Sequence, residues 1–266
     1  MNTTDNTLNG HRSSQTWTKV PKLTVYFWII KILTTAMGES TSDYMVHRFN
    51  PYFAVMLGFG MLTGALLLQF RAREYVAWIY WLAALAVSIA GTMGADVMHV
   101  GFGVPYSASV VFYAVALAVI FTVWYKSEKT LSIHSIYTRR REAFYWATVL
   151  ATFALGTAAG DLTAYTLRLG FLTSGVLFAI VFAIPGIAYG LFDLNAIFAF
   201  WFAYIFTRPL GASFADWTAK PKNFRGLGWG DGPVSFVLSV LIVILVGYLT
   251  VSREDLNVSS TDTHSL

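Results

Sequence analysis

Eight long apolar stretches, separated by short polar segments, run along most of the chain. Each is long enough for a helix that crosses a hydrocarbon core of ~30 Å, which takes about 20 residues. The pattern therefore predicts an all-α polytopic membrane protein with eight transmembrane helices. The predicted spans are 21–44, 51–70, 76–100, 107–125, 143–167, 171–190, 194–217 and 234–250.

A triplet of Trp, Gly and Asp recurs in every second span. In each copy nine residues separate the Trp from the Gly, and four separate the Gly from the Asp. An unchanged spacing in four copies indicates internal repetition, so we interpret the chain as four tandem helical-hairpin repeats, approximately 21–73, 76–129, 141–193 and 194–250. The copies are Trp28, Gly38 and Asp43; Trp81, Gly91 and Asp96; Trp146, Gly156 and Asp161; and Trp201, Gly211 and Asp216.

The spacing also predicts where the triplets lie. Because each repeat holds two spans, all four copies enter the membrane in the same direction, and their Asp residues are expected in one layer about 22 Å along the helix from the Trp. Trp near the start of a span is typical of an interfacial anchor. The four Gly residues favour close helix packing, so the odd-numbered spans are expected to form an inner ring.

Composition supports a membrane location. Hydrophobic residues are 56% of 266 and charged residues only 12%, more apolar surface than a soluble core hides. The net charge of +4 is accounted for by basic loops and needs no nucleic-acid partner. Cysteine is absent, which excludes disulfides and thiolate metal sites. The polar segments 1–20 and 251–266 are expected to be cytoplasmic tails, the first of them disordered.

Orientation follows from the basic residues in the connections. The side with more Lys and Arg is expected to be cytoplasmic, which places both termini inside a bacterial inner membrane. The basic turn 219–233 opposes this rule. One side collects Arg12, Lys19, Lys22, Arg71, Arg73, Lys126, Lys129, Arg139, Arg140, Arg141 and Arg253, and the other Arg48, Arg168, Lys220, Lys222 and Arg225.

The Asp layer is the main candidate for function. An ionised carboxylate at the membrane centre costs about 2.5 to 3.5 kcal/mol, so four of them need compensation. Either they pair with the intramembrane bases Lys31 and Arg208, or they bind a cation or share protons, because with Glu39 five acids face two bases. The candidate ion-binding residues are Asp43, Asp96, Asp161, Asp216 and Glu39.

The residue types around the layer suggest which ion it would take. Carboxylates and neighbouring hydroxyls are oxygen ligands, which suit magnesium, calcium or manganese. His47 and His99 follow the first two Asp residues and are candidate additional ligands, although a lone His more often has an ordinary surface role.

The signatures MGESTSDY, GTMGADVMHV, GTAAGDLTAY and LGASFADW closely resemble a bacterial family of uncharacterised membrane-anchored proteins that is defined by four copies of a repeat of unknown function. This resemblance covers about 20–250 and implies eight helices in an inner membrane, but no activity. In a weaker likeness, GESTSDY and AAGDLTAY resemble the signature of manganese and calcium proton-coupled exporters. The order departs from that signature, because Glu39 follows its Gly and no basic residue follows Asp161.

The leading functional hypothesis is a secondary transporter that exports a divalent cation such as manganese against proton influx, with Glu39 as an extra proton carrier. The cation would be the substrate, and no cofactor is expected. A non-catalytic membrane module with a structural Asp layer is the alternative. An intramembrane enzyme is disfavoured because no nucleophile arrangement or metalloprotease pattern occurs. The expected partners are the lipid bilayer and a small inorganic ion; assembly into a homo-oligomer stays open.

Overall fold

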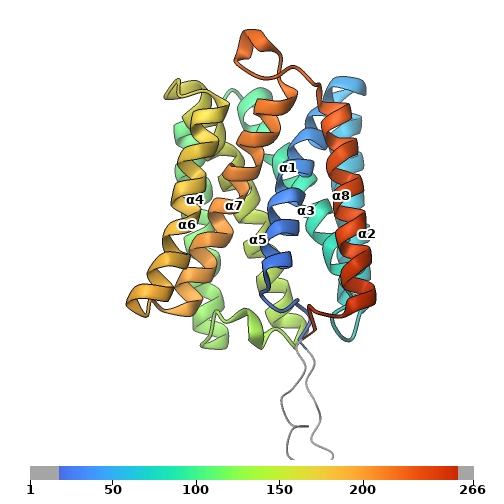
Figure 1. Cartoon of the computed structure of the whole chain (residues 1–266), viewed down its shortest axis with the longest axis vertical. Helices are drawn as coiled ribbons and strands as arrows, with labels where there is room; N and C mark the ends of the chain where they lie inside the picture. The colour runs from blue at the N-terminus through green and yellow to red at the C-terminus, as the bar shows by residue number, and fades with distance from the viewer. Residues whose placement is uncertain (1–17, 257–266) are drawn as a thin grey trace, which may run out of the picture.

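The computed structural model describes residues 18–256, which form eight α-helices and no strand (Figure 1). The predicted all-α fold is confirmed. Seven of the eight are long and apolar enough to cross a membrane; α1 is not among them, since it carries Lys31, Glu39 and a run of hydroxyl residues. The helices are α1 (Val25–Arg48), α2 (Pro51–Arg71), α3 (Ala77–Asp96), α4 (Tyr106–Glu128), α5 (Arg139–Asp161), α6 (Phe171–Phe192), α7 (Ala196–Ala219) and α8 (Asp231–Ser252).

Four short helical segments complete the described chain. Two are π-helical turns that continue α3 and α5 directly after Asp96 and Asp161. Such widened turns interrupt the regular hydrogen bonding and often lie at functional sites. The π turns are η1 (Val97–Gly101) and η3 (Leu162–Thr166), and the 3-10 turns are η2 (Ile133–Ser135) and η4 (Lys222–Phe224).

The odd-numbered helices form an inner ring in which α1 packs against α3 and α7, and α5 packs against the same two helices. In an 18-residue apolar stretch of each of α3, α5 and α7, between 61% and 67% of the residues are buried. The corresponding share in the even-numbered helices is 17% to 28%. Each even-numbered helix packs on the inner helix of the next repeat: α2 on α3, α4 on α5, α6 on α7 and α8 on α1. The fourth repeat thus closes on the first, and the bundle is cyclic.

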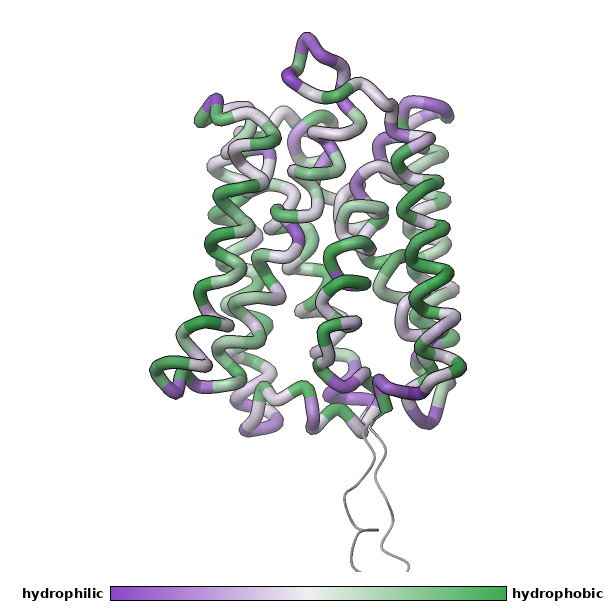
Figure 2. The backbone as a smooth tube through the Cα atoms, viewed as in Figure 1, coloured by the Kyte–Doolittle hydropathy of each residue, from purple (hydrophilic) through white to green (hydrophobic). Residues whose placement is uncertain are grey.

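The outer helices expose large apolar side chains along their length. Figure 2 shows that hydrophobic residues predominate along these helices. Met56, Val115, Ile180 and Val243, one from each even-numbered helix, are all more than half exposed. Such a continuous apolar surface is suited to lipid rather than to water.

Both described chain ends meet at one end of the bundle, which we call the terminal end; the connection between α7 and α8 projects from the other, the distal end (Figure 1). The backbone N–H of Lys19 donates to Ile136 O at 2.9 Å, and that of Lys22 donates to Asp255 O at 2.9 Å. Lys19 and Asp255 are buried. The folded part therefore includes residues 18–20 and 251–256 of the expected tails, whose other residues lie outside those described.

The four repeat Trp side chains form a cyclic aromatic layer near the terminal end. The aromatic residue that precedes each Trp packs on the Trp of the next repeat, with ring centroids 5.5 to 6.1 Å apart. Trp81, Trp146 and Trp201 are at most 5% exposed, so the expectation that they anchor in the interface is wrong: aromatic packing buries them. The pairs are Phe27 with Trp81, Tyr80 with Trp146, Tyr145 with Trp201 and Phe200 with Trp28.

Candidate functional site

Each repeat Gly lies against the inner helix of the next repeat. A Cβ atom added at any of the four would come within 3.0 Å of a residue on that neighbouring helix. In each case the contacted residue lies three positions before the Gly of the next repeat. Small residues of this kind let helix backbones approach closely in lipid. The contacts are Gly38 with Ser88, Gly91 with Phe153, Gly156 with Arg208 and Gly211 with Thr35.

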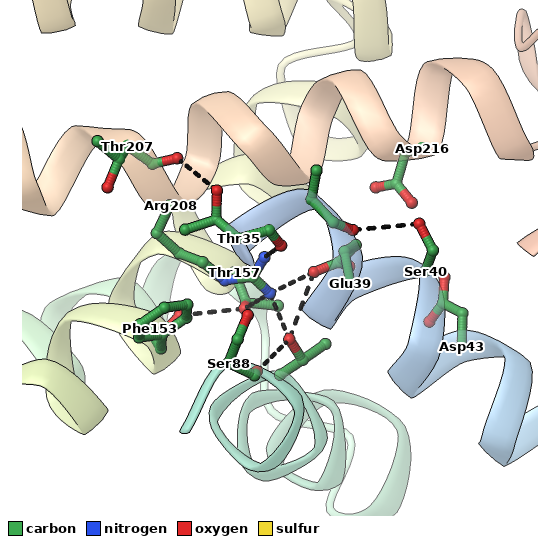
Figure 3. A network of polar contacts seen from close by, with 12 residues as sticks. Thr35, Glu39, Ser40, Asp43, Ser88, Phe153, Thr157, Thr207, Arg208 and Asp216 are labelled. Atoms are coloured by element: carbon green, nitrogen blue, oxygen red, sulfur yellow. Dashed lines mark hydrogen bonds and ion pairs between the residues drawn. The ribbon is translucent and has the colours of Figure 1, made fainter. Parts of the chain in front are cut away.

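The four residues at this contact position differ in kind, because one of them is a cation. Arg208 is completely buried, and its guanidinium reaches the residues that follow the Gly in the other three repeats (Figure 3). It donates to Thr157 Oγ1 at 2.7 Å, to Thr92 Oγ1 and to the carboxylate of Glu39, and also to the backbone O of Thr35 at 2.9 Å. One side chain thus joins all four inner helices.

An acidic group lies next to this network on the distal side. Glu39, Asp43 and Asp216 offer carboxylate oxygens that all lie within 4.8 Å of one another. Glu39 and Asp216 are buried and Asp43 is half-buried. Figure 3 shows Glu39 of α1 next to Arg208, with Asp43 of α1 and Asp216 of α7 beyond it. Among the described residues, this is the group of carboxylate and imidazole side chains close enough to hold one metal ion.

Lys220, the residue that follows α7, extends its ammonium into this group. Nζ bonds to Asp43 and lies 3.8 Å from oxygens of both Asp216 and Asp231. Burial lowers the pKa of Lys220, but the charges of Asp43 and Asp216 raise it more, so the pKa lies above its usual value. The ammonium is therefore charged at neutral pH.

Asp96 and Asp161 complete the acidic layer. Each is the last residue of its inner helix and is half-buried, and their charges interact with those of Glu39 and Asp43. Neither forms an ion pair or a side-chain hydrogen bond within residues 18–256. The four Asp residues and Glu39 are five acids against the two bases Arg208 and Lys220, an excess of three negative charges if all ionise, and Asp231 beside Lys220 adds a sixth carboxylate.

Of the two alternatives for the layer, the pairing of the Asp residues with Lys31 and Arg208 is wrong. Arg208 pairs with Glu39 instead of an Asp. The Nζ atom of Lys31 lies 4.0 Å from the ring centre of Phe153 and 4.1 Å from that of Tyr204. It has no hydrogen-bond partner among the described residues. Lys31 lies eight residues, about 12 Å of helix, before Glu39, which separates it from the carboxylates.

Lys220 is not among the site residues predicted from the sequence, because it falls in the basic turn between the last two spans. Its spacing carried a signal, since a Lys four residues after Asp216 on one helix face can reach that carboxylate. The turn itself folds back on the end of α7, where the N–H of Gly228 donates to Lys220 O at 2.9 Å. This arrangement holds Lys220 over the acidic group.

Neither candidate His lies in the acidic group. His47 is exposed, with Nδ1 3.6 Å from Asp231 Oδ2. His99 Nδ1 lies 3.2 Å from Val104 O, and its ring packs on that of Tyr106. The candidate ligands at the group are therefore carboxylate oxygens, and the nitrogen-bearing side chains that contact them are the cations Lys220 and Arg208.

The chain belongs to the family described as Repeat of Unknown Function (DUF347), which matches residues 26–75, 79–130, 144–192 and 199–255. The four matches coincide with the four Trp, Gly and Asp copies. The comparisons with curated proteins and with solved structures gave no match. Family membership thus accounts for the four repeats but assigns no activity to the chain.

Proposed function

We propose that this DUF347 protein is a secondary transporter for a divalent cation such as manganese, coupled to protons, and that it is not an enzyme. The observation that supports the proposal is the cluster of Glu39, Asp43 and Asp216, which offers three carboxylates within 4.8 Å in a largely buried setting. Three carboxylates lower the cost of removing water from a divalent ion, and oxygen ligands favour manganese, calcium or magnesium over thiophilic metals.

Lys220 gives this site a built-in competitor. Its ammonium occupies the space between Asp43 and Asp216 that an ion would take, so the ion enters only when Lys220 moves out. When no ion is bound, the Lys220 ammonium neutralises part of the charge of the carboxylates, so the acidic group is stable without an ion. Exchange of one cation for the other is a two-state event of the kind that alternating access requires.

Arg208 closes the path beyond the site. Its guanidinium joins all four inner helices directly below the acidic group, and the aromatic rings near the repeat Trp residues lie further along the bundle. Passage of an ion therefore requires Glu39 to release Arg208. Protonation of Glu39 would weaken that ion pair and couple proton movement to opening.

We further propose that the protein lies in a bacterial inner membrane with the terminal end in the cytoplasm. The larger set of basic connections, which includes Arg71, Arg73 and Arg139, lies at that end, in agreement with the positive-inside rule. The acidic group then opens to the opposite side of the membrane.

Metal flux in proteoliposomes with a pH gradient tests the proposal. The Asp43→Asn, Asp216→Asn double variant removes two carboxylates of the cluster while keeping side-chain size, and Asp161→Asn removes an unpaired one. Asp193→Asn is the matched control, because Asp193 is exposed at the terminal end and has the left-handed backbone that Asn tolerates. We expect loss of manganese flux in both test variants and full flux in the control, at equal protein content. Undiminished flux in the double variant contradicts the transport role.

The alternative is a membrane module in which Lys220 simply neutralises the acids. The contacts of Lys220 with Asp43, Asp216 and Asp231 favour it. This alternative predicts no metal flux in the wild-type protein, and reduced amounts of folded protein in the double variant, which loses two partners of Lys220.

A further inference from the structure

A basic pocket of about 380 Å³ opens at the terminal end, away from the acidic group. Three arginines from separate segments line it: Arg71 at the end of α2, Arg73 in the connection to α3, and Arg139 at the start of α5. Lys19, Phe70 and Tyr137 line the rest. Residues distant in sequence thus converge on one cavity.

The three arginines have no carboxylate partner within residues 18–256. The ion pairs of this region belong to Lys19 with Glu142, and to Arg140 and Arg141 with Glu128. Arg71, Arg73 and Arg139 are also exposed, so their donors are free for a ligand. The positive end of the α5 dipole adds to this field, because Arg139 is the first residue of that helix.

The wall of the pocket is fixed by buried contacts. Lys19 Nζ donates to Glu142 Oε2 at 2.6 Å, and Gln69 Nε2 donates to Glu142 Oε1 at 3.0 Å. The guanidinium of Arg141 packs on the ring of Tyr137, 4.8 Å from its centre. The arginines therefore line a cavity whose wall is already ordered before a ligand binds, which lowers the entropy cost of binding.

The surface beside the pocket is apolar. Leu67 and Leu68, one turn before Arg71 on α2, are 52% and 42% exposed on the outer face of the bundle. An acyl chain lying along α2 would cover them while its headgroup reached the arginines. A free anion would leave this face uncovered.

We propose that this pocket binds the phosphate headgroup of an anionic phospholipid, whose acyl chains lie along α2. Basic pockets between transmembrane helices recognise such headgroups through charge-assisted hydrogen bonds from arginine to phosphate oxygens. The proposal does not rest on the transport function, because the pocket and the acidic group lie at opposite ends of the bundle.

Native mass spectrometry of the detergent-purified full chain tests the site, with dioleoyl phosphatidylglycerol as the probe and the phosphatidylcholine with the same chains as its zwitterionic control. The test variant is Arg71→Gln, Arg73→Gln, Arg139→Gln. The matched control is Lys126→Gln, Lys129→Gln, Arg253→Gln, which removes the same charge from exposed positions at the same end outside the pocket.

We expect one phosphatidylglycerol to bind tightly to the wild-type protein and to the control variant. Each arginine near an anionic headgroup contributes about fivefold, so affinity should fall by at least about tenfold in the pocket variant. An equal loss in the control variant, equal binding of phosphatidylcholine, or full displacement by an equal concentration of inorganic phosphate overturns the proposal. The last of these outcomes identifies a free phosphate as the ligand.

Discussion

Gly156 of α5 packs directly against the side chain of Arg208 of α7. A Cβ at position 156 would come within 3.0 Å of Arg208 and of the ring of Pro209. Arg208 in turn bonds to Thr157, the next residue of α5. The close approach that the glycine permits is therefore what brings the guanidinium to the centre of the inner ring.

We expect Gly156→Ala to destabilise the protein by about 1 to 3 kcal/mol, the range for adding a methyl group to a packed core. The ring of Pro209 cannot rotate away to make room. Gly64→Ala on α2 is the control, because nothing lies within 4 Å of its added Cβ and alanine gains about 1 kcal/mol of helix propensity. Thermal unfolding in detergent measures both. Equal stability of the two variants would show that the helices do not touch at Gly156.

Removing one partner of the buried ion pair between Arg208 and Glu39 should destabilise the folded protein. Glu39→Gln leaves a fully buried guanidinium without its carboxylate, a change that typically destabilises by about 3 to 5 kcal/mol. The double variant Glu39→Gln, Arg208→Met removes both charges and should recover most of that loss. A double-mutant cycle on unfolding free energies measures the coupling. Additive effects of the two changes would contradict a paired arrangement.

The sequence predicted the helices, the repeat and the acidic layer because all three depend on patterns within one chain segment. Apolar runs of about 20 residues specify spans, and the Trp, Gly and Asp spacing fixes equivalent heights. Which base meets which acid depends on how helices distant in sequence face each other. Pairing of Arg208 with an Asp was one of two alternatives, but Arg208 reaches Glu39 across the ring, and Lys220 enters the layer only because its turn folds back. The burial of Trp81 likewise follows from its contact with Phe27 of another repeat.

Asp255 at the terminal end should make stability depend on pH. Burial raises the pKa of this carboxyl, and the hydrogen bond from Tyr75 lowers it only in part. The folded state therefore favours the protonated carboxyl. This contribution to the free energy of unfolding is present below the unfolded pKa of about 3.9, and it is lost as pH rises through the raised pKa of the folded state. We expect Asp255→Asn to be at least as stable as the wild type at neutral pH, with its relative advantage shrinking as pH falls toward 4. Thermal unfolding across pH measures this, with Asp193→Asn as the exposed control. A stability difference that grows on acidification would contradict the burial argument.

The proposed orientation is tested with single cysteines in this cysteine-free chain. His134 in the connection before α5 and Asn223 in the turn before α8 are exposed at opposite ends of the bundle. A membrane-impermeant maleimide should label Asn223→Cys on intact cells, and His134→Cys only after the cells are permeabilised. The reverse result would place the terminal end outside.

Lys220 distinguishes a cation site from a structural acid layer. If the acidic group binds a divalent ion, the ammonium competes with it, and Lys220→Gln should raise manganese affinity by at least about tenfold, equivalent to about 1.4 kcal/mol. The competition holds at neutral pH because the raised pKa keeps Lys220 charged there. Without metal the variant should be less stable than the wild type, since Asp43 and Asp216 then repel each other without a cation between them.

Thermal unfolding with and without manganese separates these effects, because an ion that binds only the folded state raises the unfolding temperature with its concentration. Lys222→Gln is the matched control, since Lys222 lies in the same turn but is exposed and forms no ion pair among the described residues. We expect manganese to restore stability to Lys220→Gln at concentrations that leave the wild type and the control nearly unchanged. A loss of stability in Lys220→Gln that manganese does not reverse would mean that Lys220 is a structural counter-ion and that the acidic group is not a cation site.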